Sequence, residues 1–189
     1  MNGYKVQTTY FKTPGSSNTD ETLKLAKKRA DELGIRNVVV ASSTGETGVK
    51  ASMLFRGFNL VIVTSVAGYS KPDEIRIKPQ YLEEIKNNGG KVVMAAHVFG
   101  SIGRSIHNKF NAIQIDEVIA GVLRLFSEGV KVALEISSMS VDAGLIRTDE
   151  ETISIAGEGG GADTAVVVQP SNTHTFFDSK VREIICKPR

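Results

Sequence analysis

Tryptophan is absent from this 189-residue sequence, cysteine occurs once, and aromatic residues make up only 6% of the chain. The lone Cys186 cannot form an internal disulfide, and the opening residues show no apolar leader, so we expect a cytoplasmic location. No segment approaches the about 18 consecutive apolar residues of a membrane-spanning helix, so no membrane association is expected. Three histidines and one cysteine show no ligand spacing typical of a metal site, and we predict no metal.

Charge of one sign is also lacking, because 23 Lys and Arg stand against 21 Asp and Glu for a formal net charge of +2. Basic residues are interspersed with acidic ones, as on the solvated face predicted for residues 20–32. Nucleic-acid binding usually needs a concentrated basic stripe with aromatic side chains for stacking. We therefore expect no nucleic-acid partner.

The chain does contain enough apolar material for one core, with 41% hydrophobic residues. Domains of roughly 100–200 residues bury most of the apolar surface of the unfolded chain. No internal repeat or low-complexity linker divides the sequence. We predict a single domain over residues 1–189.

Strand-like and helix-like segments alternate through the first half. Residues 18–21 carry capping side chains, and apolar residues follow at helical spacing, which predicts a helix over 19–33 that ends at Gly34. The nearly continuous apolar run 35–41 predicts a strand buried on both faces. This alternation predicts a three-layer α/β/α sandwich with a mostly parallel sheet. The remaining predicted elements are a helix from the turn 42–48 with Val49, Met53 and Leu54 inward, a strand at 60–64, a helix from Pro79 with Leu82 and Ile85 inward, and a strand at 91–95.

The second half is less regular. Apolar residues recur at helical spacing over 115–126 and predict a buried helix. The segment 130–145 fits both a strand and a helix, and we favour a helix. Strands are predicted at 152–156 and 164–168 on either side of a glycine-rich turn, and a last strand at 181–185.

The polar turn 42–48 is the first candidate binding site. Ligands of open α/β sheets bind beyond the carboxyl ends of the strands. Hydroxyls, backbone N–H groups and the positive end of a helix dipole converge in such a turn, which suits a phosphate. The same residues fit a simple capped helix start equally well.

Three stretches carry a resemblance to a known family. Residues 21–47 are similar to the C-terminal domain of pyruvate kinase, where a Ser/Thr/Gly turn holds a phosphate of the sugar bisphosphate activator. Residues 152–164 are similar to that domain's late strand and glycine-bearing effector loop. Residues 141–145, Val-Asp-Ala-Gly-Leu, resemble stand-alone and mostly archaeal proteins of this fold. The resemblance implies this fold and a homo-oligomer, and no kinase activity, because pyruvate kinase catalysis belongs to a separate barrel.

The resemblance also implies a phosphorylated small-molecule ligand. The parent family neutralises two phosphates with Lys or Arg, whereas Glu46 and Glu158 stand in these loops, which disfavours a bisphosphate. One phosphate with an uncharged body along a glycine-rich surface suits a mononucleotide, and the stand-alone relatives imply flavin mononucleotide (FMN). The glycine run also fits a plain tight turn. The implied cofactor-binding residues are Ser42, Ser43, Thr44, Gly45, Glu46, Thr47, Thr64, Ser65, His97, Gly157, Gly159, Gly160, Gly161 and Thr164.

His97 and Glu135 are the candidate acid and base. His97 follows the third predicted strand and has a near-neutral pKa, yet a loop histidine with a local hydrogen bond is an equal possibility. Glu135 and Asp142 lie seven apart near one helix face, either as a buried catalytic pair or as a cap or salt bridge. Arg104 and His107 suit a phosphate but are commonly surface residues. An enzyme acting on a phosphorylated metabolite, or a flavin-dependent oxidoreductase, is the alternative to a binding module.

Overall fold

In residues 3–189, the part of the chain that the computed structural model describes, seven strands form one sheet in the order β1-β7-β6-β5-β2-β3-β4. β1 pairs parallel with β7, and β2 pairs parallel with both β3 and β5, while β4 is parallel to β3. β6 is antiparallel to β5 and to β7. The sheet is therefore mostly parallel, as predicted. The strands are β1 Thr9–Phe11, β2 Asn37–Ala41, β3 Asn59–Thr64, β4 Lys91–Met94, β5 Thr152–Ala156, β6 Thr164–Gln169 and β7 Lys180–Pro188.

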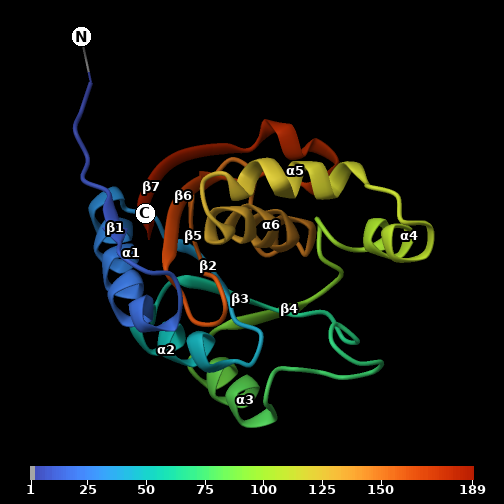
Figure 1. Cartoon of the computed structure of the whole chain (residues 1–189). Coiled ribbons are helices and arrows are strands. Elements are labelled where there is room, and N and C mark those ends of the chain that lie inside the picture. The colour runs from blue at the N-terminus through green and yellow to red at the C-terminus, as the bar shows by residue number, and fades with distance from the viewer. Residues whose placement is uncertain (1–2) are drawn as a thin grey trace.

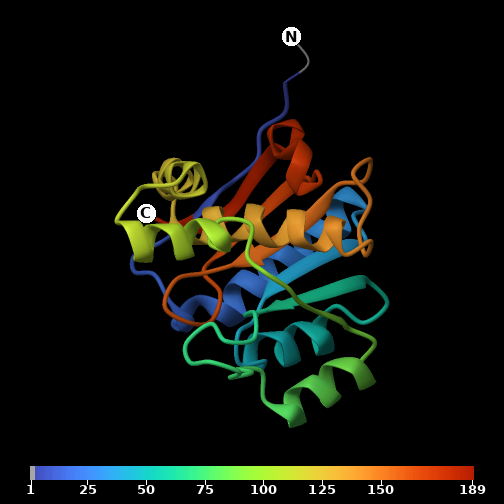
Figure 2. The same cartoon turned by 90° about the vertical axis from the view of Figure 1, so that its right-hand side faces the viewer.

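Helices cover both faces of this sheet, which confirms the three-layer α/β/α architecture (Figures 1 and 2). α1 Thr19–Leu33, α2 Glu46–Leu54 and α3 Pro79–Asn87 pack on one face. α6 Glu128–Asp142 packs on the other face, and α5 Ile115–Arg124 lies against α6. The remaining elements are α4 Ile102–Phe110 and the short 3-10 helices η1 Ser16–Asn18 and η2 Thr173–Asp178.

The predicted alternation of helices and strands holds because the inner strands β2, β3, β5 and β6 are buried on both faces. Val38 and Val40 of β2 enter the core under α1 and α2, whereas Val39 enters the core under α6. α1 begins at Thr19 and ends at Leu33, as predicted, with Gly34 in the left-handed conformation that favours glycine. The ambiguous segment 130–145 is helical as far as Asp142, so the favoured helix is confirmed over most of it.

Two predictions about packing are wrong. α5 forms, but Ala120 is its fully buried apolar residue and most of its apolar side chains are exposed, because the helix packs on α6 along one narrow face. Met53 of α2 points outward and Leu54 is also exposed. α2 packs so closely that a Cβ on Gly48 would lie 3.0 Å from Ile62 of β3 and 2.8 Å from Ile85 of α3, so small residues face inward there.

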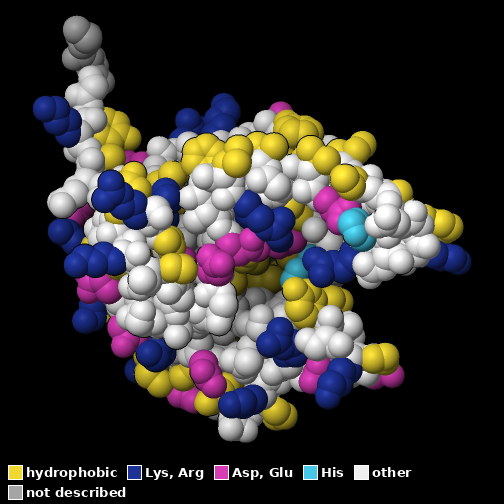
Figure 3. Space-filling view, in the orientation of Figure 1, with side chains coloured by type: hydrophobic (Ala, Val, Ile, Leu, Met, Phe, Trp, Pro, Cys, Tyr) yellow, Lys and Arg dark blue, Asp and Glu magenta, His cyan; other side chains and the backbone are white. Residues whose placement is uncertain are grey.

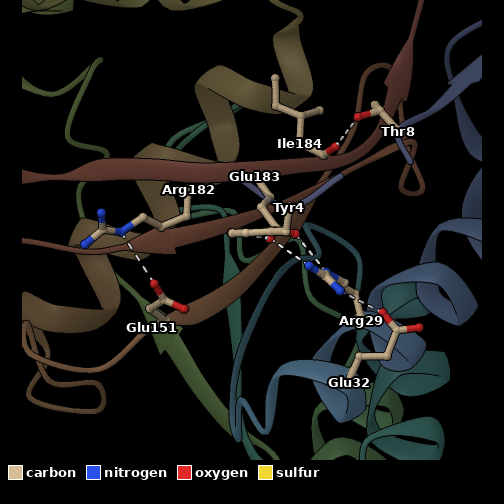
Figure 4. A network of polar contacts seen from close by, with 8 residues as sticks. All are labelled: Tyr4, Thr8, Arg29, Glu32, Glu151, Arg182, Glu183 and Ile184. Carbon is tan, nitrogen blue, oxygen red and sulfur yellow. Dashed lines mark hydrogen bonds and ion pairs between the residues drawn. The ribbon is translucent and has the colours of Figure 1, made fainter. Parts of the chain in front are cut away.

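A polar network fastens α1 and the N-terminal segment to the edge of the sheet (Figure 4). Arg29 of α1 donates two hydrogen bonds to the carboxylate of Glu183 on β7, at 2.7 and 2.8 Å. Tyr4 also donates to Glu183, and Thr8 donates to the carbonyl of Ile184. These contacts complement the parallel pairing of β1 with β7.

Within residues 3–189, none of the helices combines the length and the apolar character needed to cross a membrane.

Candidate functional site

The candidate site lies beside β2, where the order of the strands reverses between β2 and its neighbour β5. β2 continues into α2 on one face, while β5 is preceded by α6 on the other. A crevice at such a switch point, beyond the carboxyl ends of the strands, is where open α/β sheets bind ligands. A cleft of about 800 Å³ lies at this place. Figure 3 shows a hollow in the centre of this face, with acidic, basic and histidine side chains on its rim.

The structure brings most of the sequence-predicted residues to this one cleft, although they come from five separate segments. Gly45 and Thr164 do not line it. A Cβ on Gly45 would lie 2.6 Å from Tyr81, and Gly45 adopts φ +102°, so its role is the turn into α2. Thr164 is fully buried and donates to Asp163. The predicted residues that line the cleft are Ser42, Ser43, Thr44, Glu46, Thr47, Thr64, Ser65, His97, Glu135, Gly157, Gly159, Gly160 and Gly161.

The turn between β2 and α2 is a compact hydroxyl cluster. Ser42 accepts the N–H of Gly48 at 2.9 Å and so uses one of the free donors of the α2 N-terminus. Ser65 donates to the hydroxyl of Ser43 at 2.9 Å, and Thr64 donates to the Ser43 carbonyl. The N–H groups of Glu46 and Thr47 have no acceptor among the described residues. The helix N-terminus therefore retains donors that an anion could use.

The glycine-rich hairpin between β5 and β6 forms a second wall. Gly159, Gly160 and Gly161 all have φ between +67° and +111°, where side chains are strained. Gly161 also leaves no room for a Cβ, which would lie 2.4 Å from the hydroxyl of Thr19. That hydroxyl accepts the N–H of Ala162 at 3.0 Å. The hairpin is thus held against the start of α1 and presents backbone to the cleft.

A buried carboxylate, Asp163, organises this wall. It accepts N–H groups from Gly15 at 2.8 Å and Glu158 at 3.2 Å, and the hydroxyl of Thr164 at 2.7 Å. Sequence reasoning missed this role, because an Asp that follows glycines reads as an ordinary turn residue. Its apolar flanks, Ala162 and the β6 strand, were the available signal that the carboxylate is buried.

The floor of the cleft contains a buried ion pair on α6. Lys131 donates to Glu135 at 2.6 Å, and both side chains are almost fully buried. The second oxygen of Glu135 accepts the N–H of Phe99 at 3.0 Å. Asp142 is not part of this pair, since it accepts from Asn172 and Thr173 at the far end of the helix. Asp142 therefore links α6 to η2, the structural alternative that the sequence left open.

His97 lies above this ion pair. Its Nδ1 is 3.9 Å from Glu135, and its Nε2 is buried without a hydrogen-bond partner among residues 3–189. Burial lowers the pKa of His97, Lys131 and Arg104 lower it further, and Glu135 opposes the shift. The imidazole is therefore neutral over most of the physiological range. It stacks on the ring of Tyr69 with centroids 5.3 Å apart.

More cationic side chains line the cleft than the sequences of the two predicted binding loops contain. The guanidinium groups of Arg76 and Arg104 both lie about 6 Å from the Tyr69 ring. Lys50 pairs with Asp20, and Arg124 pairs with Glu128. Sequence reasoning missed Lys50, Arg76 and Arg124, because they come from α2, the loop before α3 and α5, which are far apart in the chain. His107 pairs with Glu117 at 3.0 Å and does not line the cleft.

Of the two acidic residues that weighed against a bisphosphate, one is paired with a lysine and the other does not line the cleft. Glu46 lies 3.4 Å from the ammonium of Lys78, so its charge is partly offset. Glu158 donates its N–H to Asp163, and its side chain does not line the cleft. The repulsion expected between a second phosphate and these carboxylates is weaker than the sequence implies.

The fold and the site together define a class of protein. It is an α/β domain with a mostly parallel sheet and a polar cleft, walled by glycines, at the carboxyl ends of the strands. Residues 20–168 match the family described as pyruvate kinase, alpha/beta domain. The chain belongs to this family, which confirms the resemblance found in the sequence.

A solved pyruvate kinase from Cryptosporidium parvum is also similar, with 16% identity and a TM-score of 0.39. The similarity covers 79% of this chain but only 22% of that one, so the chain spans about a fifth of that kinase. Structural similarity of this degree supports no conclusion by itself, and the family assignment rests on the sequence match.

Proposed function

We propose that the cleft binds a phosphorylated small molecule, with one phosphate at the turn 43–47. The observation that carries the proposal is that the N–H groups of Glu46 and Thr47, which line the cleft beside three hydroxyl side chains, have no acceptor in the described part of the chain. A dianion there receives backbone hydrogen bonds and the positive end of the α2 dipole. Charge-assisted bonds of this kind are about twice as strong as neutral ones.

A mononucleotide, specifically FMN, suits the rest of the cleft. The volume of about 800 Å³ lies within the usual range for cofactor sites. The glycine hairpin offers a flat backbone surface, and the Tyr69–His97 stack offers an aromatic face to a planar ring. Arg76 and Arg104 beside Tyr69 favour an electron-rich ring or a further anionic group at that end.

Calorimetric titration with FMN, riboflavin and fructose 1,6-bisphosphate tests the proposal. FMN is expected to bind at least about tenfold more tightly than riboflavin, which lacks the phosphate, because charged hydrogen bonds contribute about 1.5–3 kcal/mol each. Equal affinities for FMN and riboflavin contradict a phosphate site at the turn. Tighter binding of the bisphosphate overturns the single-phosphate assignment and favours the arginines as a second phosphate site.

Catalysis is a second candidate function, favoured by one observation. Burial lowers the pKa of His97, its buried Nε2 has no hydrogen-bond partner within residues 3–189, and the ring lies beside the Lys131–Glu135 pair in the same cleft. Such a group can accept a proton from a bound metabolite or from a reduced flavin. The absorption spectrum of the purified protein reports any bound flavin. Catalysis is supported if the wild type oxidises an added electron donor and His97→Gln does not, while the variant still binds FMN with wild-type affinity. If the wild type shows no turnover, the protein is a binding module.

A further inference from the structure

The outer face of α5 carries a row of apolar side chains that nothing in residues 3–189 covers. Ile115, Val118, Val122 and Leu125 are exposed by 80%, 56%, 54% and 83%. Phe126, just beyond the helix, is also more than half exposed. Figure 3 shows hydrophobic atoms along the edge of the molecule where Figure 1 places α5. We call these five residues the α5 stripe.

The α5 stripe is large for a lone protein surface. At these exposures, the five side chains leave on the order of 600 Å² of apolar surface in water, at the upper limit of the largest patch on a typical monomer. Ile102 and Phe110 of α4 and Ile113 of the connecting segment are also largely exposed. Together they bring the surface to roughly 900 Å², which matches the about 800 Å² that each partner buries in a standard interface.

The spacing of the α5 stripe indicates what covers it. Positions 115, 118, 122 and 125 alternate intervals of three and four residues, the repeat that lets two helices pack knobs into holes. Gly121 lies beside this row, near its midpoint, and a Cβ there would have nothing within 4 Å. A glycine at that position lets a second helix approach closely.

The polar residues of α5 favour another helix over a lipid surface. Interfacial membrane helices carry Lys and Arg on their polar face. In α5, Asp116 and Glu117 begin the helix, and Arg124 is the lone basic residue. Glu117 accepts the N–H of Gln114 at 2.9 Å and pairs with His107, so the helix start is fixed before any partner arrives.

We propose that α5 packs antiparallel against α5 of a second copy of this chain, across a twofold axis near Gly121. A twofold axis makes one patch complementary to itself, and antiparallel packing sets the dipoles of the two helices in opposite directions. Antiparallel packing about this axis places Val118 of one copy opposite Val122 of the other. The proposal is independent of the ligand, since the α5 stripe lies outside the cleft.

Light scattering on a size-exclusion column at about 100 µM tests the assembly. The wild-type mass is expected to be an even multiple of the 20.4 kDa chain. Val118→Glu/Leu125→Glu is expected to halve that mass or reduce it to one chain, because four carboxylates would meet in an apolar seam. Met53→Glu, an equally exposed methionine on the opposite face, is the matched control and retains the wild-type mass. Circular dichroism checks that each variant is folded.

Cross-linking tests the antiparallel geometry. Cys186 is fully buried, so a cysteine added on α5 is the only accessible thiol in the described chain. Under mild oxidation, a mixture of Val118→Cys and Val122→Cys chains is expected to form disulfide dimers at least about tenfold faster than either variant alone. A monomeric wild type, a double variant with unchanged mass, or equal cross-linking by each variant alone overturns the proposal. So does a monomer that instead co-sediments with anionic phospholipid vesicles.

Discussion

Glu183 on β7 receives two parallel hydrogen bonds from the guanidinium of Arg29 on α1, at 2.7 and 2.8 Å (Figure 4). Side chains far apart in the sequence thereby join a helix of one outer layer to the edge of the sheet. Both side chains are mostly buried, so this pair is less screened by water than the surface pairs of the chain.

Removing this pair is expected to destabilise the fold. Glu183→Gln should lower the free energy of unfolding by about 1–3 kcal/mol, the usual contribution of hydrogen bonds to a charged group. Glu151→Gln is the control, because its pair with Arg182 is 3.4 Å long and more than 40% exposed on both sides. The control should lose less than about 0.5 kcal/mol. Urea unfolding at pH 7 measures both, and equal losses contradict a special role for Arg29–Glu183.

The same pair predicts a pH dependence. Arg29, opposed by burial, holds the pKa of Glu183 below its ordinary value of 4.5. The folded state therefore binds the proton less readily than the unfolded state, and the stabilisation is complete above pH 4.5 and lost as the pH falls through the lowered value. The difference in unfolding free energy between wild type and Glu183→Gln should shrink between pH 5 and pH 3. A constant difference across that range would refute the assignment.

Gly161 is expected to tolerate no side chain. Gly161→Ala combines a positive φ with a Cβ that would lie 2.4 Å from Thr19 and 2.5 Å from the backbone of Ser16. Gly159→Ala has a similar φ but open space, so it isolates the conformational strain, about 1 kcal/mol. We expect Gly161→Ala to lose at least about 1 kcal/mol more, which lowers the melting temperature by roughly a further 2–4 °C. Equal melting temperatures would show that the hairpin moves away from α1 at little cost.

The proposed phosphate turn predicts graded losses of FMN affinity. Thr44→Ala and Thr47→Ala should each weaken binding by roughly 1–2 kcal/mol, the cost of one hydrogen bond to a charged group. Gly160→Val should weaken it more, because a branched side chain at φ +111° distorts the backbone that the ligand approaches. Thr175→Ala removes an exposed hydroxyl outside the cleft and serves as the control. Calorimetry measures each affinity, and wild-type affinity in both cleft threonine variants rules out this turn.

The protonation of His97 offers a test without any ligand. Its pKa is lowered by burial first, and Arg104 contributes to the shift. Arg104→Gln should therefore raise the His97 pKa, and Glu135→Gln should lower it further. Proton NMR titration measures the midpoint, with His97→Gln identifying the resonance. A wild-type midpoint at or above 6.5 would contradict the buried position.

Much of the fold was predictable because its elements follow local rules. The helix over 19–33 has capping residues at one end and a glycine at the other, and β2 is apolar on both sides. The exposure of α5 was not predictable in this way. Its apolar spacing would be the same whether the stripe packed inside the chain or against another molecule.

The residues of the candidate site also fall into a predictable and an unpredictable group. The polar turn after β2 and the glycine hairpin could be predicted because strand ends of a parallel sheet meet at one edge. Arg76, Arg124 and Lys131 could not, since each is an ordinary charged residue within its own segment. Their convergence depends on how α6 and the loop before α3 lie over the sheet, which is tertiary information.

The position of β2 inside the sheet, between β5 and β3, also affects the order in which the protein can assemble during synthesis. β2 and β3 leave the ribosome early, but β5, the other neighbour of β2, follows about 110 residues later. At about 5–20 residues per second, one edge of β2 stays unpaired for roughly 5–20 s. That edge presents the apolar run 38–40, a template for pairing with another chain. Chaperone binding to nascent chains should therefore peak before residue 152 is made and fall once β5 and the hairpin emerge.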